Sequence, residues 1–411
     1  MRVLFLSQIV PYPPHGGVLQ RGFNILRELG NLADVHLLAF MHPDALPTPD
    51  TLAESREVLG RFCRTVEYFP LWVKKSPLHK AAGLGLSLFS RAPFGAIAHR
   101  SRAFGERVSA ETRASRFDVV HVDTIGLSPF VDLEHPPAAT VLTHHNIESM
   151  LMGRRSQLQS GRAARAFLAR EAVKLEQAER RIPPQFDLNI VMSESDGRAL
   201  AELAPEARSA VVPNGVDTSY FTPALNRETP ALIYGGGMNM FANCDAVMYF
   251  LTEVWPAIQA VRPDLRFFAV GQDPPRELLA MSERDPRIVV TGYVKDIREY
   301  IAQAAVYVVP LRVGGGTRLK VLDAMAMGKA MVSTSTGCEG INVTPGEHLL
   351  ISDTPQAFAN ATLALLDDPA RRQSLGQAAR ALVEHEYAWP VVGRQLIDGY
   401  QEAIRVRASK S

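Results

Sequence analysis

The sequence predicts an α/β protein made of two doubly wound domains in tandem, which face each other across a cleft. Short apolar runs recur along the chain with longer helical patterns between them, as is typical of a parallel sheet covered by helices on both faces. A passage rich in Pro, Gly and Asn at residues 212–230 interrupts this pattern, which then begins again. The length of 411 residues also favours two domains, because one domain usually contains roughly 100 to 200 residues.

Each half of the chain supplies its own strands. In the first half we expect them at residues 3–6, 35–40, 119–122, 140–143 and 188–192. In the second half we expect them at residues 231–234, 266–270, 288–290, 306–309 and 330–333. The predicted domains are residues 1–213 and residues 214–389. Trp389-Pro390 interrupts a helical pattern near the C-terminus, so we expect a last helix at 390–411 to fold back and complete the first domain.

The composition excludes several classes of protein. With 46% hydrophobic and 21% charged residues the chain is typical of a globular enzyme, and its net charge of +1 gives no general attraction to nucleic acid. Three cysteines, Cys63, Cys244 and Cys338, lie far apart without a zinc or disulfide pattern, which favours a reducing cytoplasm. The first apolar stretch is too short for a signal peptide, and no other stretch approaches the ~20 apolar residues of a membrane span. We therefore expect a cytoplasmic protein.

Two glycines stand between the first strand and a helix that begins near Leu19. Gly16 and Gly17 would let the backbone approach a phosphate group at the helix N-terminus, where negative charge is favoured. The segment is not GxGxxG, so the fingerprint of a dinucleotide site is absent. A plain tight turn explains the pair equally well.

A second glycine-rich loop follows the strand predicted at 306–309. The three glycines at 314–316 precede a helix that begins with Arg318 and Lys320, so free backbone amides and two cations stand together. This combination suits a diphosphate, whose charge must be stabilised when it leaves. Asp323 lies about one helical turn further along, where its carboxylate can accept hydrogen bonds from two ribose hydroxyls.

Several segments match the pattern of one enzyme family, and together they span nearly the whole chain. They are residues 3–6 with Gly16-Gly17, 212–217, 267–271, 291–294, 314–328, 333–334 and 337–340. On these segments the chain resembles GT-B glycosyltransferases of the large retaining family 4. Within that family it is most similar to the sugar transferases associated with exosortase (PEP-CTERM) exopolysaccharide loci.

The resemblance implies two Rossmann-like domains, the first on the acceptor side and the second binding the donor. It implies transfer of a hexose-type sugar from a nucleotide diphosphate sugar to a saccharide or lipid-linked acceptor, in exopolysaccharide or cell-envelope glycan synthesis. Catalytic roles are implied for His145, Arg318 and Lys320. Donor contacts are implied for Gly16, Gly17, Gly236, Tyr293, Val294, Gly315, Gly316, Thr317, Arg318, Lys320 and Asp323.

The chain departs from the family pattern at two places. The family usually carries two glutamates separated by seven residues, and here Gly315 replaces the first and Asp323 the second. The family also often carries Arg and Lys after the first strand of the second domain, where this chain has Gly235-Gly236-Gly237. We hypothesise that Arg318 and Lys320 neutralise the diphosphate in place of that missing pair.

A pair of histidines, His144 and His145, follows a predicted strand directly. His145 aligns better with the histidine that the family often places near the transferred sugar, and an imidazole can donate a hydrogen bond to a sugar hydroxyl. A purely structural role for the pair is the alternative. A metal site is not expected there, because consecutive residues of an extended segment point in opposite directions.

The resemblance also implies how configuration is retained. In the family, the common explanation is that the phosphate leaves and the acceptor attacks on the same face of the sugar. The leaving phosphate assists removal of the proton. No protein nucleophile is then needed, which agrees with the lack of a nucleophile and base constellation or a paired carboxylate motif in the sequence. No DxD triad follows a predicted strand, so we expect no metal cofactor, and the nucleotide sugar is a substrate.

Two stretches, residues 68–105 and 149–170, contain basic and apolar residues but no acidic ones. Such segments allow a protein to rest on an anionic bilayer, here the inner membrane. Ordinary helices with solvated positive faces are the alternative.

Two other functions also stay open. One is a non-catalytic GT-B subunit that binds nucleotide for a partner, which the glycine at position 315 favours. The other is a nucleotide-sugar epimerase, which the small number of carboxylates near Gly315 disfavours.

Overall fold

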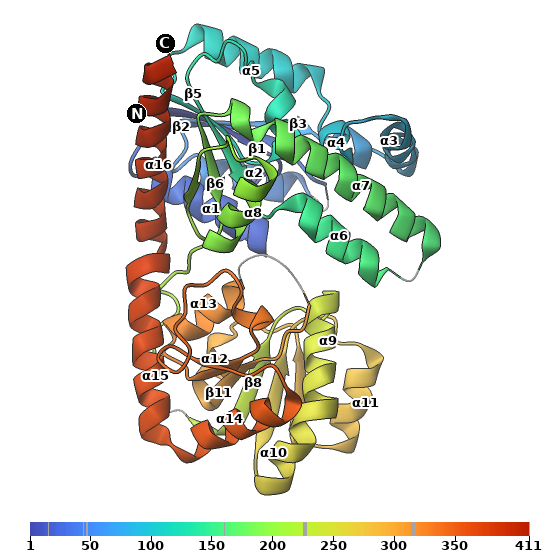
Figure 1. Cartoon of the computed structure of the whole chain (residues 1–411), viewed down its shortest axis with the longest axis vertical. Coiled ribbons are helices and arrows are strands. Elements are labelled where there is room, and N and C mark those ends of the chain that lie inside the picture. The colour runs from blue at the N-terminus through green and yellow to red at the C-terminus, as the bar shows by residue number, and fades with distance from the viewer. Residues whose placement is uncertain are drawn as a thin grey trace. The chain divides into compact units, whose positions relative to one another are not determined.

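The computed structural model describes residues 1–14, 16–43, 45–46, 48–159, 161–224, 228–313 and 318–410. The chain forms two compact units (Figure 1). Unit 1 consists of Met1–Pro213 together with Val392–Ser411, and unit 2 consists of Asn214–Val391. Each unit is built on one parallel sheet with helices around it, so the predicted α/β class with two Rossmann-like domains is confirmed.

The strands of unit 1 are β1 (Arg2–Ser7), β2 (Asp34–Met41), β3 (Thr65–Pro70), β4 (Val119–Val122), β5 (Ala139–His144), β6 (Leu188–Val191) and β7 (Ser209–Val211). Within the described residues they form a seven-stranded parallel sheet in the order β3-β2-β1-β4-β5-β6-β7. The direction of the strand order reverses between β1 and β4. Ligands of open α/β sheets bind at such a reversal, beyond the carboxyl ends of the strands.

The helices of unit 1 are α1 (Gly17–Gly30), α2 (Pro49–Leu59), α3 (Pro77–Phe89), α4 (Phe94–Ala98), α5 (Arg102–Ala114), α6 (Glu148–Leu158), α7 (Arg162–Arg181) and α8 (Glu194–Leu203), with 3₁₀ turns η1 (Trp72–Lys74), η2 (Ile125–Phe130) and η3 (Pro183–Gln185). Local sequence explains where some of them begin. Thr48 and Thr51 form a capping box before α2, and Pro49 occupies its first position. Gly16 precedes α1 with a φ of 89°, a conformation that favours glycine.

The C-terminal helix α16 (Trp389–Lys410) belongs to unit 1 from Val392 onward. The Tyr400 hydroxyl lies 2.8 Å from Nδ1 of His121 on β4, and both side chains are buried. Near the end of the helix, Lys410 Nζ donates a hydrogen bond of 2.9 Å to Asp187 Oδ1. Apolar packing and these polar contacts attach the last segment of the chain to the first sheet.

The strands of unit 2 are β8 (Thr229–Gly235), β9 (Arg266–Val270), β10 (Ile288–Gly292), β11 (Ala304–Val309), β12 (Met331–Ser333) and β13 (Leu350–Ile351). Within the described residues they form a six-stranded parallel sheet in the order β10-β9-β8-β11-β12-β13. Its reversal point lies between β8 and β11. Unit 2 therefore repeats the architecture of unit 1 with its own reversal point.

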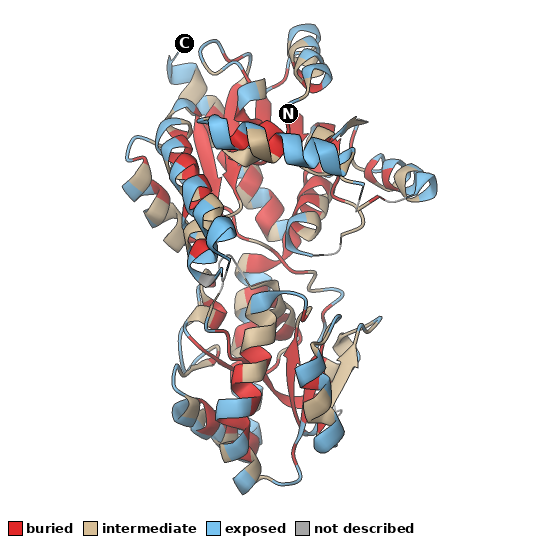
Figure 2. Ribbon diagram, turned by 90° about the vertical axis from the view of Figure 1, so that its right-hand side faces the viewer, coloured by how far each residue is buried: buried red, intermediate tan, exposed pale blue. Residues whose placement is uncertain are grey.

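The helices of unit 2 are α9 (Phe241–Tyr249), α10 (Trp255–Val261), α11 (Arg276–Arg284), α12 (Arg298–Gln303), α13 (Leu319–Ala326), α14 (Pro355–Asp367) and α15 (Pro369–Leu382), with π-helical turns η4 (Phe250–Val254) and η6 (Val383–Tyr387) and a 3₁₀ turn η5 (Thr336–Cys338). Figure 2 shows the strands of both sheets mainly as buried ribbon between partly exposed helices. None of the described helices is long and apolar enough to cross a membrane.

All ten strands expected from the sequence are present, but three others were missed. β3, β7 and β13 each form an edge of a sheet. β3 is only partly buried and contains Glu67, so it lacks the continuous apolar run that marks a central parallel strand. β7 and β13 contain three and two residues, which is too short for a periodic signal.

Candidate functional site

Polar side chains gather at the reversal point of the sheet in unit 2. Lys320, on the first turn of α13, donates hydrogen bonds from Nζ to the Tyr234 hydroxyl at 2.8 Å and to Asn243 Oδ1 at 2.6 Å. Tyr234 lies on β8, and its hydroxyl also donates to Asn243 Oδ1 at 2.8 Å. The helix that follows β11 is thereby connected to β8 itself and to α9, the helix that follows β8. The cation of Lys320 thus sits where a ligand of an open α/β sheet is expected.

The loop after β8 approaches this cation closely. A Cβ atom added to Gly236 would lie 2.6 Å from Lys320 Nζ, and one added to Gly271, after β9, would collide with the Gly236 carbonyl oxygen. The side-chain amide of Asn243 donates a hydrogen bond of 2.8 Å to the Gly237 carbonyl, which holds the loop against α9. Gly236, predicted from the resemblance, therefore lies beside Lys320, and only glycine fits there without displacement.

Asp323 lies one turn after Lys320 on α13 and is half-buried. None of the described residues donates a hydrogen bond to its carboxylate. Burial raises the pKa of Asp323 to about 7, although the nearby Lys320 charge opposes this rise. Burial also lowers the pKa of Lys320 to about 7, assisted by the Arg318 charge and opposed by Asp323. Both groups can therefore change charge near neutral pH.

Arg318 immediately precedes α13, and its side chain is 10% exposed. Its guanidinium donates a hydrogen bond of 3.4 Å to the Thr336 carbonyl and lies 3.8 Å from a carboxylate oxygen of Glu339. Arg318 is also close enough to Lys320 to depress that residue's pKa. The structure thus brings together four of the predicted residues: Gly236, Arg318, Lys320 and Asp323.

The other predicted donor residues lie elsewhere or are not described. Tyr293 directly follows β10 and is 74% exposed, while Val294 packs partly against the core of unit 2. Gly16 and Gly17 belong to unit 1, at the start of α1. Gly315, Gly316 and Thr317 lie outside the described residues.

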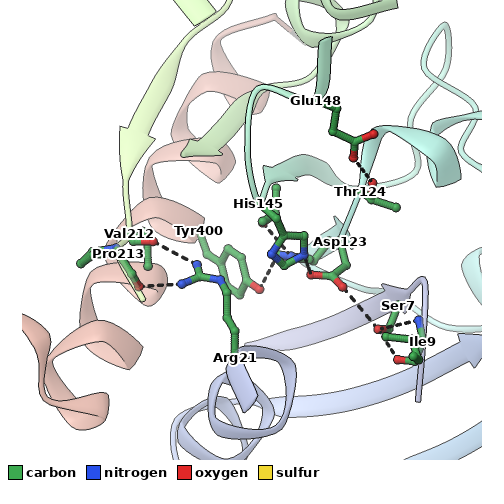
Figure 3. A network of polar contacts seen from close by, with 12 residues as sticks. Ser7, Ile9, Arg21, Asp123, Thr124, His145, Glu148, Val212, Pro213 and Tyr400 are labelled. Atoms are coloured by element: carbon green, nitrogen blue, oxygen red, sulfur yellow. Dashed lines mark hydrogen bonds and ion pairs between the residues drawn. The ribbon is translucent and has the colours of Figure 1, made fainter. Parts of the chain in front are cut away.

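A second polar cluster lies at the reversal point of unit 1 (Figure 3). His145 follows β5, and its Nε2 lies 3.0 Å from Oδ1 of Asp123, which follows β4. The Ser7 hydroxyl at the end of β1 donates to the other carboxylate oxygen of Asp123 at 3.4 Å. Because an ionised carboxylate only accepts hydrogen bonds, Asp123 directs the N–H of His145 to Nε2 and leaves Nδ1 for another partner.

The two neighbouring histidines point elsewhere and are buried. His144 Nε2 lies 3.1 Å from Asn189 Oδ1, so consecutive histidines do point in opposite directions, as predicted. His121, on β4, lies 3.0 Å from the Thr143 hydroxyl through Nε2. Burial lowers the pKa of His144 to about 4 and of His121 to about 3. These two rings are neutral structural groups, and His145 alone of the three is held by a carboxylate.

Two carboxyl groups lie beside this cluster, Glu148 at the start of α6 and the buried Glu179 on α7. Glu148 accepts a hydrogen bond of 3.1 Å from the Thr124 hydroxyl, and burial raises its pKa. Glu179, on α7, accepts a hydrogen bond of 2.7 Å from the Glu148 backbone N–H and so satisfies the helix N-terminus. Burial raises the pKa of Glu179 to about 7. Among the described residues, no group of three His, Cys, Asp or Glu side chains is arranged to hold a metal ion.

Comparison with protein families agrees with this geometry. The sequence model described as "Glycosyltransferase Family 4" matches residues 15–220, half of the chain, and the model described as "Glycosyl transferases group 1" matches residues 229–368. The chain belongs to glycosyltransferase family 4. The boundary between the two matches falls beside the division between unit 1 and unit 2.

Individual relatives of this family 4 protein are distant. A GDP-mannose-dependent monoacylated alpha-(1-6)-phosphatidylinositol monomannoside mannosyltransferase of Corynebacterium glutamicum is 26% identical over 47% of this chain and 56% of its own length. A D-inositol 3-phosphate glycosyltransferase of Kineococcus radiotolerans is 23% identical over 56% of this chain and 61% of its own length. The matches thus cover little more than half the length of these curated relatives.

Solved structures resemble the whole family 4 chain in fold. Sucrose-phosphate synthase from Thermosynechococcus elongatus superposes with a TM-score of 0.68 at 17% identity, covering 100% of both chains. HepE of Anabaena, determined in complex with UDP-glucose, superposes with a TM-score of 0.64 at 17% identity, covering 97% of this chain and 98% of its own. At these identities the likeness establishes the GT-B fold.

Sequence reasoning missed three residues of these clusters: Asp123, Tyr234 and Asn243. Asp123 stands directly after a predicted strand, so the rule that drew attention to His145 could also have found it. Tyr234 reads as one more apolar residue of a buried strand, and Asn243 as one polar residue of a helix. Their role becomes visible only in the folded structure, where the Lys320 side chain donates hydrogen bonds to both.

Proposed function

We propose that this protein transfers a hexose-type sugar from a nucleotide diphosphate sugar to a saccharide or lipid-linked acceptor, with retention of configuration. We further propose that the reaction serves exopolysaccharide or cell-envelope glycan synthesis of the exosortase-associated kind. The family supports the reaction type. The observation that carries the proposal is the arrangement of Lys320 and Asp323, a cation and an available carboxylate at the reversal point of unit 2.

Lys320 and Arg318 are the groups that would bind the diphosphate. Lys320 is held at the loop after β8, which is the place where many family members carry their own cations. Its position supports the hypothesis that α13 supplies the charge that the loop lacks. A bound diphosphate would favour the charged form of Lys320 and so oppose the effect of burial on its pKa. The same charges would stabilise the phosphate as it leaves.

Asp323 is the group that would bind the ribose. Its carboxylate has no hydrogen-bond donor among the described residues, and a buried acceptor without donors is costly. Two ribose hydroxyls would supply those donors and lower the raised pKa of Asp323. Asp323 would then distinguish a nucleotide from a simple diphosphate.

His145 is the group of unit 1 that would contact the transferred sugar. Asp123 fixes the orientation of the ring, so Nδ1 is available to a hydroxyl group. In the step that we propose, the bond from the anomeric carbon to the phosphate oxygen breaks, and the acceptor oxygen bonds to the same face of that carbon. The acceptor proton passes to an oxygen of the leaving phosphate. This step uses no protein nucleophile and, in our proposal, no metal ion.

The exposed apolar residues of α3 support a further part of the proposal, contact with an anionic membrane surface. Phe89 is 93% exposed and Leu78 is 81% exposed, at opposite ends of the helix. Lys74, Lys75 and Lys80 lie close to them in the sequence. Flotation of the purified protein with liposomes tests this part. We expect binding to liposomes with anionic lipid and loss of binding in Leu78→Ser with Phe89→Ser; protein that stays at the bottom of the gradient with every lipid contradicts it.

A binding and turnover screen against UDP-, GDP- and ADP-sugars tests the proposed reaction. We expect one nucleotide class to bind and to be slowly hydrolysed, and Asp323→Ala to weaken its binding by at least about tenfold, as loss of hydrogen bonds to a charged group should. Arg284→Ala, an exposed position on α11, is the matched control. Binding without turnover, even with a membrane extract as acceptor, favours the non-catalytic partner subunit instead. Formation of an epimeric nucleotide sugar identifies an epimerase.

A further inference from the structure

Unit 1 contains a cavity that none of the predicted site residues lines. Its volume is about 420 Å³, and it lies among α4, η2 and α7. This size is in the range of small-molecule binding sites. Much of its wall is apolar, with contributions from Pro93, Ile125, Leu175 and Ile182.

One end of the cavity lies close to the His145 and Asp123 pair. Thr124 and Glu148 both line the cavity, and the hydroxyl of Thr124 donates to the carboxyl group of Glu148 at 3.1 Å (Figure 3). Thr124 is the residue after Asp123, and Glu148 begins the helix that follows His145. A hydroxyl group bound at this end would meet two polar side chains beside the pair to which we assign the transferred sugar.

Arginine side chains line other parts of the cavity. Arg91 and Arg181 both contribute to the wall, and neither forms an ion pair with any described residue. Lys174 also lines the cavity, but its charge is balanced by Glu171, whose carboxylate oxygen lies 2.6 Å from Nζ. Of the basic side chains on the wall, the two arginines are therefore the ones without a carboxylate partner among the described residues, and Glu148, whose pKa is raised by burial, is the acidic group at the far end. The charge of the two arginines is suited to an anion, and the planar guanidinium group suits a phosphate in particular.

Arg91 also lines a second, more open groove of about 780 Å³. The groove shares Lys174 and Gln177 with the cavity and extends over α7 to Arg170 and Val173. The guanidinium of Arg170 donates a hydrogen bond of 2.8 Å to the Leu88 carbonyl at the end of α3. The side chains of Leu88 and Phe89 are 47% and 93% exposed. Apolar surface therefore lies beside the groove, and Arg91 lies where the groove and the cavity meet.

We propose that the cavity and the groove together bind the acceptor, and that this acceptor is an amphiphile carrying a phosphate ester. The phosphate lies between Arg91, at the junction, and Arg181, on the cavity wall. The hydroxyl-bearing end occupies the cavity toward Thr124 and Glu148, and the apolar chain follows the groove toward Phe89. The assignment of the ligand as acceptor rests on the proposed transferase function, whereas the binding site itself does not.

Binding of octyl phosphate to the full chain, measured by titration calorimetry below its micelle concentration, tests the proposal. Inorganic phosphate and 1-octanol are the comparison ligands, because each carries one half of the recognised chemistry. We expect octyl phosphate to bind at least about tenfold more tightly than either, since a charge-assisted contact and apolar burial both contribute. Equal binding of 1-octanol, equal binding of inorganic phosphate, or no binding of octyl phosphate overturns the proposal.

Two variants locate the ligand. Arg91→Gln with Arg181→Gln removes the anion contacts, and Val173→Asp places a like charge in the groove at a residue that is 54% exposed. Each should weaken octyl phosphate binding at least about tenfold. The matched controls are Arg102→Gln, whose side chain is 92% exposed on α5, and Val261→Asp, which is 59% exposed in unit 2. Unchanged binding in both test variants overturns the proposed location.

A last variant separates this proposal from the proposed reaction. Asp323→Ala lies in unit 2 and should leave octyl phosphate binding unchanged while nucleotide binding falls. If octyl phosphate binds as expected but no nucleotide sugar is turned over, the binding site stands and the transferase function fails. If nucleotide sugar is turned over but octyl phosphate does not bind, the function stands and this site fails.

Discussion

The Nε2 atom of His145 lies 3.0 Å from Oδ1 of Asp123, and each residue directly follows a strand of the same parallel sheet. The two side chains are only 10% and 6% exposed. The carboxylate therefore fixes which nitrogen of His145 carries the hydrogen atom and leaves Nδ1 for a ligand.

This relationship predicts a separation of turnover from donor binding. His145→Ala should lower turnover by about 10² or more, which is the lower end of the effect of a positioned proton donor or acceptor. Asp123→Asn should also lower turnover, because an amide can present its N–H to the ring and reverse the tautomer. Nucleotide binding should change little in either variant. Steady-state kinetics with His135→Ala, an exposed histidine, as control measures this; an equal loss of turnover in the control contradicts the role of His145.

The contacts of Lys320 predict that its charge, and not its packing, is needed for donor binding. Lys320→Met preserves length but removes the cation, so we expect nucleotide-sugar affinity to fall by about 1.5 to 3 kcal/mol, or roughly tenfold to a hundredfold. Adding Arg318→Ala should lower the affinity further. The comparison is with Arg284→Met on the exposed face of α11. Wild-type affinity in the double variant of Lys320 and Arg318 refutes the idea that α13 supplies the charge.

The pKa values of Lys320 and Asp323 predict how donor binding depends on pH. Lys320, whose pKa is lowered to about 7, loses its positive charge as the pH rises above that value. Asp323, whose pKa is raised to about 7, becomes protonated and loses acceptor strength as the pH falls below it. Affinity for a nucleotide sugar should therefore be highest near pH 7 and fall by up to about tenfold per pH unit on either side.

Each side of this profile has its own control. Lys320→Arg should flatten the alkaline side, because the pKa of arginine stays far above the measured range. Asp323→Asn should flatten the acidic side, since an amide does not titrate. Fluorescence or calorimetric titrations between pH 5.5 and pH 8.5 measure the profile. A wild-type affinity that is constant over this range shows that the two groups do not control binding.

The hydrogen bond between Tyr400 and His121 predicts how strongly the C-terminal helix stabilises unit 1. Tyr400→Phe leaves a buried ring nitrogen of His121 without its partner, which should cost about 1 to 3 kcal/mol of unfolding free energy. Tyr12→Phe removes the exposed hydrogen bond to Glu54 and should cost less than about 1 kcal/mol. Denaturant titrations of the two variants compare them directly. Equal, small losses in both mean that the Tyr400 hydroxyl contributes little.

The proposed mechanism predicts that donor turnover does not depend on a metal ion. Treatment with EDTA followed by gel filtration should leave turnover within about twofold of its starting value, because the cations assigned to the diphosphate are Arg318 and Lys320. Addition of Mg²⁺ or Mn²⁺ should not raise it. A loss of activity that Mg²⁺ or Mn²⁺ restores means that the diphosphate is neutralised by a metal instead.

The alternation of apolar runs with helical patterns was enough to predict the class of fold. Strands of a parallel sheet are buried on both faces, so they consist of continuous apolar residues that can be recognised in the sequence. Residues 3–6 and 306–309 are such runs, and both are buried. Polar residues that end an apolar run mark the end of a strand, where ligands of such sheets are expected to bind. His145 belongs to the pair that directly follows a predicted strand, whereas Arg318, Lys320 and Asp323 were predicted from the glycine-rich loop before a helix and from the family resemblance.

Which of these side chains meet depends on how the folded chain packs. The contacts of Lys320 with Tyr234 and Asn243 span 86 and 77 residues of the chain, and nothing in the local pattern around any of the three residues specifies the other two. The pKa values of Lys320 and Asp323 depend on burial, which arises only when the sheet and its helices pack. The cavity among α4, η2 and α7 was also invisible in the sequence, because its walls come from segments that are distant along the chain and adjacent only in the folded unit.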